Sequence, residues 1–167
     1  LMWFVTGIST GLTQGFSIQL SQYYGAKDFE NLRKSLAHSY RLTAFIAAGV
    51  LILSQSFASL VLTGLHTPSN IIGMSLLYLR IIFCGIPATA AYNMFASALR
   101  AMGNSKTPLT AMIIASVLNV SLDILFVAGF GWGVAGAAIA TVIAQSFSAV
   151  YCFLILRRID IVHLTRA

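Results

Sequence analysis

Three oxygen-bearing side chains could together hold a small cation. Asp123 is the only acidic residue inside a long apolar stretch, and Asn119 stands four residues before it, on the same face of a helix. Thr141 lies in the next apolar stretch. Counted from the turn between the two stretches, Asp123 lies ~9 Å and Thr141 ~10 Å below the same surface. We therefore expect carboxylate, amide and hydroxyl oxygens to converge, a donor set that hard cations prefer.

Arg80 offers Asp123 a different partner. It lies ~14 Å into its own apolar stretch, close to the level of Asp123. A charged side chain inside a bilayer costs ~2.5–3.5 kcal/mol, so such residues have either a function or a fixed partner. An Arg80–Asp123 ion pair would be structural, and removing one member of a buried pair is costly. The sequence is compatible with both a cation site and a static pair.

Other polar side chains in the apolar stretches are candidates for the lining of a cavity. Hydroxyls form a stripe along the first stretch, which lipid alone does not select, although hydroxyls can also bond to their own helix. Tyr78 and Arg80 fall on opposite sides of one helix, because two helical steps turn ~200°. Only one of these two faces should meet a polar interior. The candidate lining residues are Thr10, Thr13, Ser17, Tyr78, Tyr92, Asn93 and Gln145.

Gly85 and Pro87 should interrupt the third apolar stretch. Pro87 removes one helical hydrogen bond and clashes with the carbonyl of Phe83, so we expect a kink or hinge at this point. Proline is tolerated in membrane helices, and a static kink is as compatible with the sequence as a moving hinge.

The composition requires that these residues sit in a membrane. Charged residues are 8% of the 167-residue chain and apolar residues 58%, against typical values of ~25% and ~45–50%. So few charges cannot cover a water-exposed globule, and disorder needs the opposite composition. The net charge of +6 does not indicate a nucleic-acid partner, because the basic residues lie at the ends of apolar runs. The predicted fold class is an all-α integral membrane helix bundle.

The uncharged stretches define five expected transmembrane helices. A bilayer core takes ~20 apolar residues per helix, so the long stretch over 42–79 must hold a loop, and a glycine-rich segment over 129–133 divides the last one. A cytoplasmic amphipathic connection is expected over 24–41. The spans are expected at about 2–23, 42–62, 71–99, 108–129 and 134–156.

The basic residues orient these spans. Nine of the ten follow the first, third or fifth span. Because cytoplasmic loops are enriched in Lys and Arg, these loops and the C-terminus should be cytoplasmic in a multi-pass protein of the cell membrane. The first span would then start outside with no signal sequence before it. We therefore expect the sequence to be a fragment that lacks a preceding helix.

A series of short motifs follows the same order along the chain. Gln22-Tyr23-Tyr24-Gly25-Ala26-Lys27-Asp28 ends the first span, and Gly85-x-Pro87 and Tyr92-Asn93 lie in the third. Leu99-Arg100-Ala101-Met102-Gly103-Asn104-Ser105-Lys106-Thr107-Pro108 follows, then Asn119-x-x-x-Asp123 and Gly133-Val134-Ala135-Gly136-Ala137-Ala138-x-Ala140-Thr141. In this order and spacing the motifs resemble the second to sixth helices of the multidrug and toxic compound extrusion (MATE) family of antiporters.

The resemblance implies a fold of twelve helices in two six-helix lobes around a central cavity. This sequence would be part of the N-terminal lobe, and the first helix and the whole C-terminal lobe would be absent. The resemblance also implies that Asp123, Asn119 and Thr141 take three positions of the family's cation site, with an acid on the first helix as the fourth. The implied function is secondary active efflux of organic cations or other amphipathic drugs by antiport with Na⁺ or H⁺.

Other function classes have less support in the sequence. No nucleophile–base constellation, phosphate loop or metal-spaced cluster is found, so we expect a transporter rather than an enzyme, with no cofactor beyond the coupling ion and no metal other than Na⁺. The expected partners are the bilayer, the drugs and the missing parts of the same protein. Because burial disfavours a charged carboxylate and a bound cation favours it, protons and Na⁺ should compete at one site.

Two alternative functions remain. A lipid-linked oligosaccharide flippase of the same superfamily should carry more cationic residues in its cavity, to meet pyrophosphate, and only Arg80 qualifies here. A structural membrane protein that transports nothing would use Asp123 and Arg80 as a brace.

Overall fold

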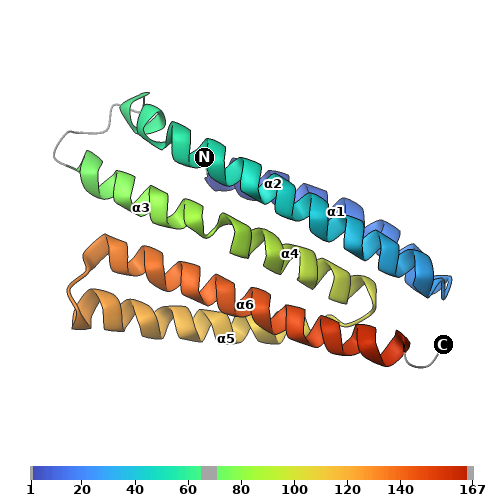
Figure 1. Ribbon diagram of the computed structural model, residues 1–167. Helices are drawn as coiled ribbons and strands as arrows, with labels where there is room; N and C mark the ends of the chain where they lie inside the picture. Colours follow the sequence, from blue (N-terminus) through green and yellow to red (C-terminus); the bar gives the residue numbers. More distant parts are fainter. Residues whose placement is uncertain (1, 65–70, 165–167) are drawn as a thin grey trace.

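The computed structural model describes residues 2–64 and 71–164, and the regular structure in these residues is helical. The helices form three layers, with α1 and α2 on one side, α3 and α4 in the middle, and α5 and α6 on the other side (Figure 1). In chain order they are α1 (Met2–Gly25), α2 (Phe29–Gly64), α3 (Ile72–Cys84), α4 (Ile86–Ala101), α5 (Lys106–Asp123), η1 (Ile124–Gly129) and α6 (Gly133–Leu164).

Four segments of the described chain are long and apolar enough to cross a membrane. They are Phe29–Ala58, Ile72–Ala101, Lys106–Gly129 and Gly133–Ile159. These segments lie where the second to fifth spans were expected. α1 covers the expected first span as a helix of 24 residues, but it is not one of the four. The all-helical membrane fold predicted from composition is confirmed.

The amphipathic connection expected over 24–41 is not a separate surface helix. α2 runs without a break from Phe29 to Gly64, so residues 29–41 form the first turns of a membrane-spanning helix. No proline lies in this stretch, and each added residue extends a helix that is already nucleated. The expected apolar face is present, because Leu32 and Leu36 are buried in the core.

Two turns share one construction at the end of the bundle where most Lys and Arg residues lie, which we name the basic end. Lys27 (φ 57°) and Gly103 (φ 81°) each lie two residues after the end of a helix, α1 and α4 respectively, and adopt the left-handed conformation. The next residues, Asp28 and Asn104, return their N–H groups to carbonyls of the helix just ended, as in a Schellman motif. Their side chains then accept an N–H from the first turn of α2 or α5, at 3.1 Å in both cases. The two N–H groups of Asn31 that donate to Asp28 lower the pKa of that carboxyl.

The turn between η1 and α6 depends on glycine for a different reason. Gly131 (φ 68°) and Gly133 (φ 54°) adopt backbone conformations that other residues rarely reach, and they reverse the chain within the glycine-rich break expected over 129–133. A Cβ on Gly136 would lie 3.0 Å from the Cβ of Phe126. The absence of a side chain at Gly136 therefore lets α6 pack directly against η1.

The main core lies toward the basic end, where α1, α2, α4, α5 and α6 meet. It holds α4 in the middle of the bundle and so fixes what each face of that helix meets. Its buried members are Leu20, Leu32, Leu36, Met94, Ala98, Leu99, Ala111, Cys152 and Leu156.

Candidate functional site

A hydrogen bond joins α5 to α6 through two of the residues expected at a cation site. The Nδ2 of Asn119 donates to the Oγ1 of Thr141 at 3.3 Å. Thr141 in turn donates to the carbonyl of Ala137 at 3.0 Å. Both side chains are half-buried. Because the interhelical bond uses the amide nitrogen, it leaves the amide oxygen of Asn119 available as a ligand.

Asp123 is the last residue of α5, one turn beyond Asn119. Its side chain is half-buried, and its Oδ1 is enclosed without a hydrogen-bond partner in the described part of the chain. An enclosed polar atom without a partner is unfavourable, so this position suits a group that takes up a proton or a cation. The helix changes directly after Asp123 into the π-helix η1, a rare conformation that often marks functional sites.

A cavity of about 310 Å³ lies between α4, α5 and α6, beside the Asn119–Thr141 bond. We name it the polar cavity, because hydroxyl and amide side chains make up much of its lining. Asp123 is not one of the lining residues and lies one helical turn from Asn119, which is. The lining residues are Thr89, Tyr92, Asn93, Met112, Ala115, Ser116, Asn119, Thr141, Ala144, Gln145 and Ser148.

The break expected in the third span is present at Gly85, which separates α3 from α4. Pro87 lies in the first turn of α4, where its missing N–H costs no hydrogen bond. A Cβ on Gly85 would lie 2.9 Å from the Cγ2 of Val142, so glycine is needed for α6 to approach this closely. The bend is therefore a packed feature of the structure, and movement at it stays a prediction.

Side-chain contacts connect this break to the polar cavity. The Oγ1 of Thr89 donates to the Oε1 of Gln145. It also lies 3.2 Å from the carbonyl oxygen of Gly85. Gln145 follows Thr141 by one turn of α6. A continuous series of contacts therefore leads from the Asn119–Thr141 bond along α6 to the Gly85 break.

Tyr92, Asn93 and Gln145 line the polar cavity, as the sequence led us to expect. The Tyr92 hydroxyl donates to the carbonyl of Pro108 at 3.3 Å, which fixes its ring against the start of α5. Further polar lining residues were not singled out from the sequence. Each lies three residues from one that was, so stripes of i, i+3 spacing would have found them. They are Thr89, Ser116 and Ser148.

Other expected lining residues lie elsewhere. Ser17 donates to the carbonyl of Ser97 at 3.4 Å and so joins α1 to α4, away from the polar cavity. Tyr78 is half-buried on α3 and is not one of the lining residues either. Thr10 and Thr13 belong to α1, and their side chains lie outside the described part of the structure.

The alternative ion pair between Arg80 and Asp123 is not formed. Arg80 is exposed on α3, which packs against α2 and α6, whereas Asp123 belongs to α5, on the opposite side of α6 (Figure 1). The ion pair found among the described residues joins Lys34 to Glu30 at 2.7 Å. The static-pair interpretation is wrong because equal depth does not bring two side chains together when their helices do not pack.

The donor set restricts which ions this region could hold. No group of three or more His, Cys, Asp or Glu side chains in the described residues could hold a metal ion. What the structure offers near the polar cavity is one carboxylate with amide and hydroxyl groups, all of which are hard ligands.

Comparison with known proteins identifies the family. The sequence pattern described as MatE matches residues 1–125 of this chain. The chain belongs to the MatE family. The resemblance noted from the sequence motifs is thereby confirmed, and the matched part of this MatE chain includes Asn119 and Asp123, whereas Thr141 lies beyond it.

Two curated relatives are longer than this chain. The probable multidrug resistance protein YoeA of Bacillus subtilis is 32% identical over 160 residues, which cover 93% of this chain and 34% of YoeA. The probable lipid II flippase MurJ of Thermotoga maritima is 32% identical over 129 residues, which cover 77% of this chain and 26% of MurJ. The chain therefore spans about a third or less of the length of these relatives.

Solved structures share the fold of this MatE chain. A crystal structure of MATE in complex with MaD3S superposes with a TM-score of 0.86 at 24% identity, over 92% of this chain and 35% of that one. At this identity the likeness concerns the fold alone. Together with the four apolar spans, it makes the chain part of a multi-pass membrane protein.

Proposed function

We propose that the intact protein exports amphipathic drugs, organic cations among them, across the cell membrane in exchange for Na⁺ or H⁺. Asp123 is the coupling residue, and Asn119 and Thr141 assist it. The observation that carries the proposal is the Asn119–Thr141 bond one turn from an enclosed Asp123 oxygen that lacks a partner among the described residues. The name of the relative YoeA supports drugs as the substrate class.

The basic end of the bundle is proposed to face the cytoplasm. The basic residues of the turns after α1 and α4, and of the last turns of α6, lie at this one end. Cytoplasmic loops carry such an excess of Lys and Arg, so the C-terminal end of this chain is cytoplasmic as well.

Ion uptake at Asp123 acts on the packing of α5 against α6. A carboxylate without a partner disfavours close packing in a medium of low dielectric constant, and neutralisation by H⁺ or Na⁺ removes that penalty. If α5 and α6 can pack in two arrangements, the ion shifts the equilibrium between them only by the difference in its affinity for the two. In this mechanism, the cation enters from outside, favours the arrangement with weak drug affinity and so releases the drug outward.

The contacts along α6 offer a route from the ion to the bend in the third span. A shift of α6 moves Gln145, which holds Thr89 in the first turn of α4. Thr89 is next to the carbonyl of Gly85, so the angle of the break responds to the position of α6. Drug affinity is thereby linked to the state of Asp123.

The flippase named among the relatives provides a second candidate function. A lipid-linked substrate carries pyrophosphate, which proteins bind with Arg and Lys side chains. None of the residues that line the polar cavity is basic. Arg80 is exposed on α3 and lies outside that lining. The chemistry of the polar cavity therefore favours a drug over a pyrophosphate.

The test is efflux of a fluorescent lipophilic cation by the intact protein and by its Asp123→Asn variant, driven in turn by an imposed Na⁺ gradient and an imposed proton gradient. We expect efflux in the variant to fall ~10-fold or more at equal expression, the loss that follows removal of ~1.4 kcal/mol. Asparagine preserves the shape of the side chain but carries no exchangeable charge. Glu30→Gln is the matched control, because it removes an exposed carboxylate at the basic end and should leave efflux unchanged.

Normal gradient-driven efflux by Asp123→Asn would overturn the coupling role. Equal loss in Glu30→Gln would indicate that removing any carboxylate damages the protein. Absence of efflux by the wild type, together with movement of a lipid-linked substrate, would establish the flippase instead.

Thr141→Val separates Na⁺ from H⁺ as the coupling ion. If Na⁺ is the ion, loss of the Thr141 hydroxyl should weaken the dependence of efflux on Na⁺ concentration, because an oxygen ligand is gone. If H⁺ is the ion, Asp123 alone carries it, and the pH dependence of efflux should stay as in the wild type. Titrating efflux against each ion in both proteins distinguishes these outcomes.

A further inference from the structure

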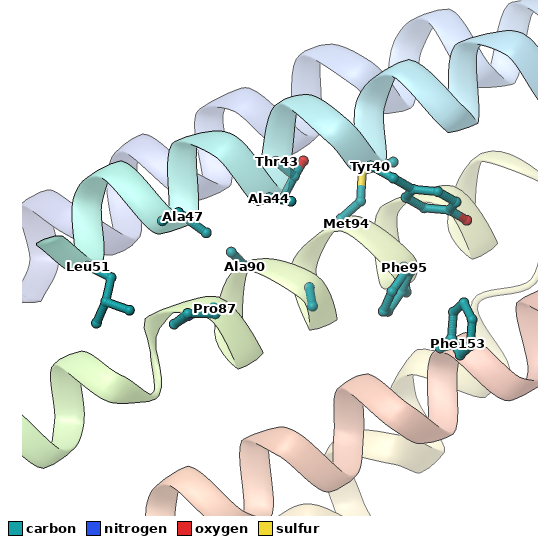
Figure 2. A pocket seen from close by; sticks show the side chains of 12 residues that line it. Tyr40, Thr43, Ala44, Ala47, Leu51, Pro87, Ala90, Met94, Phe95 and Phe153 are labelled. Carbon is teal, nitrogen blue, oxygen red and sulfur yellow. The ribbon is translucent and has the colours of Figure 1, made fainter.

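A second cavity, of about 450 Å³, lies on the other side of α4, between α2, α4 and α6 (Figure 2). We name it the apolar cavity, because hydrocarbon makes up almost all of its surface. Ala44, Ala48 and Phe153 are exposed, so the cavity is open along the outside of the described helices. Its lining residues are Tyr40, Thr43, Ala44, Ala47, Ala48, Leu51, Pro87, Ala90, Ala91, Met94, Phe95 and Phe153.

The two ends of the apolar cavity differ in chemistry. One end of the apolar cavity lies toward the basic end of the bundle. Three aromatic rings follow one another there, so we name it the aromatic end (Figure 2). The ring of Phe95 lies 5.6 Å from that of Tyr40 and 5.3 Å from that of Phe153. The other end is formed by Leu51 and Pro87. Tyrosine and tryptophan concentrate where a bilayer meets water, so Tyr40 indicates that the aromatic end of the cavity lies on the headgroup side.

The length of the apolar cavity matches one leaflet of a bilayer. Tyr40 and Leu51 line its two ends on α2. Their separation along that helix is ~16 Å at 1.5 Å per residue. The hydrocarbon core of a bilayer is ~30 Å thick, so the cavity covers about half of it. An acyl chain of one leaflet has this extent.

Two exposed arginines flank the aromatic end of the cavity. Arg41 precedes Ala44 and Ala48 by three and seven residues and so belongs to the same face of α2. Arg157 follows Phe153 by four residues, on one face of α6. Neither arginine forms an ion pair with another described residue. Long arginine side chains near helix ends extend to headgroup level, so we expect both positive charges near the aromatic end of the apolar cavity.

We propose that the apolar cavity binds an acyl chain of an anionic phospholipid whose headgroup lies at the aromatic end of the cavity, where Arg41 and Arg157 attract its negative charge. Guanidinium groups bind phosphate through paired hydrogen bonds, and a lipid with a net negative charge offsets part of the charge of the two arginines. A zwitterionic lipid supplies the same chain but no net charge, and a cationic drug is repelled by the arginines. The site is separate from the polar cavity, since no residue lines both.

The test is native mass spectrometry of the intact protein in nanodiscs that contain equal amounts of phosphatidylglycerol and phosphatidylcholine. We expect the wild type to retain phosphatidylglycerol preferentially. Arg41→Gln/Arg157→Gln should reduce that retention by about fivefold for each arginine lost, the effect of one basic residue near an anionic surface. The matched control, Lys106→Gln/Arg158→Gln, removes equal charge from the same end. Lys106 belongs to α5, and Arg158 lies ~100° around α6 from Arg157, so this variant should retain the lipid.

A second pair of variants tests whether the cavity itself is occupied. Ala48→Trp fills the apolar cavity and should abolish retention of both lipids. Leu53→Trp is the control, because Leu53 is 59% exposed and does not line the cavity, and it should leave retention unchanged. Equal losses in the two charge variants would overturn the proposal in favour of general attraction to a positive surface. Equal retention of the two lipids by the wild type, or retention of phosphatidylglycerol by Ala48→Trp, would also overturn it.

Discussion

α4 separates two cavities of similar size and opposite chemistry. Toward α5 and α6 it presents Thr89, Tyr92 and Asn93 to the polar cavity of about 310 Å³. Toward α2 it presents Pro87, alanines and Met94 to the apolar cavity of about 450 Å³. Hydrogen bonds between helices cross beside the first, whereas the second is bounded by packed aromatic rings (Figure 2).

The difference follows from what polar and apolar side chains each need inside a membrane protein. A polar side chain in contact with hydrocarbon has no water to bond, so it is stable only where another helix supplies a partner. Thr89 and Asn119 find such partners on α6. An apolar cavity has no unsatisfied groups and can remain open to lipid. The polar face of α4 therefore requires helix neighbours, and the apolar face does not.

The largest effect should come from shortening the side chain that anchors the apolar face. Met94 is 1% exposed and belongs to the main core. Met94→Ala should lower the free energy of unfolding by ~2 kcal/mol or more, because the space it leaves does not fully collapse. Met74→Ala, at a position 57% exposed on α3, is the control and should be close to neutral. Thermal unfolding of the intact protein measures both. A small effect at Met94 would mean that the apolar face is loosely packed and can repack.

Adding one methyl group at the break should have the next largest effect. Gly85→Ala places a Cβ 2.9 Å from Val142 and should cost ~1–3 kcal/mol, because α4 and α6 must move apart. Gly49→Ala, in the middle of α2, meets nothing within 4 Å and should instead stabilise the helix by ~0.5–1 kcal/mol. Thermal unfolding shifts of opposite sign are expected. Shifts of the same sign would show that close packing at the break contributes nothing.

The smallest effect should be the coupling across the polar side. A double-mutant cycle of Thr89→Val and Gln145→Leu should give a coupling energy of ~0.6 kcal/mol, and ~1.7 at most, the range for hydrogen bonds between membrane helices. The control is a second cycle that combines Thr89→Val with Ser146→Ala. The hydroxyl of Ser146 donates to the carbonyl of Val142 in its own helix at 2.7 Å, so Ser146 should not couple to Thr89. Equal coupling energies in the two cycles would show that the Thr89–Gln145 bond does not link the break to the polar cavity.

Much of the fold was predictable because the bilayer imposes simple rules. The low charge, the lengths of the apolar stretches and the glycine and proline positions predicted helices where α1, α3, α4, α5 and α6 lie, and the break at Gly85. Depth counting also brought Asn119 and Thr141 together, because their helices are joined by a short turn and must be neighbours. When two antiparallel helices are joined by a short turn, side chains at the same depth in the membrane usually lie close to each other.

The same counting failed for Arg80. Its expected depth is close to that of Asp123, but α3 and α5 pack on opposite sides of α6, and depth carries no information about the angle around the bundle. The continuous α2 was missed for a related reason, since charges near its start indicated a surface segment although nothing there interrupts a helix. The apolar cavity was also missed, because alanines are ordinary residues of membrane helices and their pattern does not show where a gap remains.

The sequence by itself therefore determined that this chain is a membrane helix bundle and where most of its helices lie. These features depend on transfer between water and lipid, which acts on each segment separately. The tertiary structure alone decided which helices pack, and so which face of α4 lines the polar cavity and which lines the apolar cavity. Packing depends on the fit of several helices at once, and no single segment contains that information.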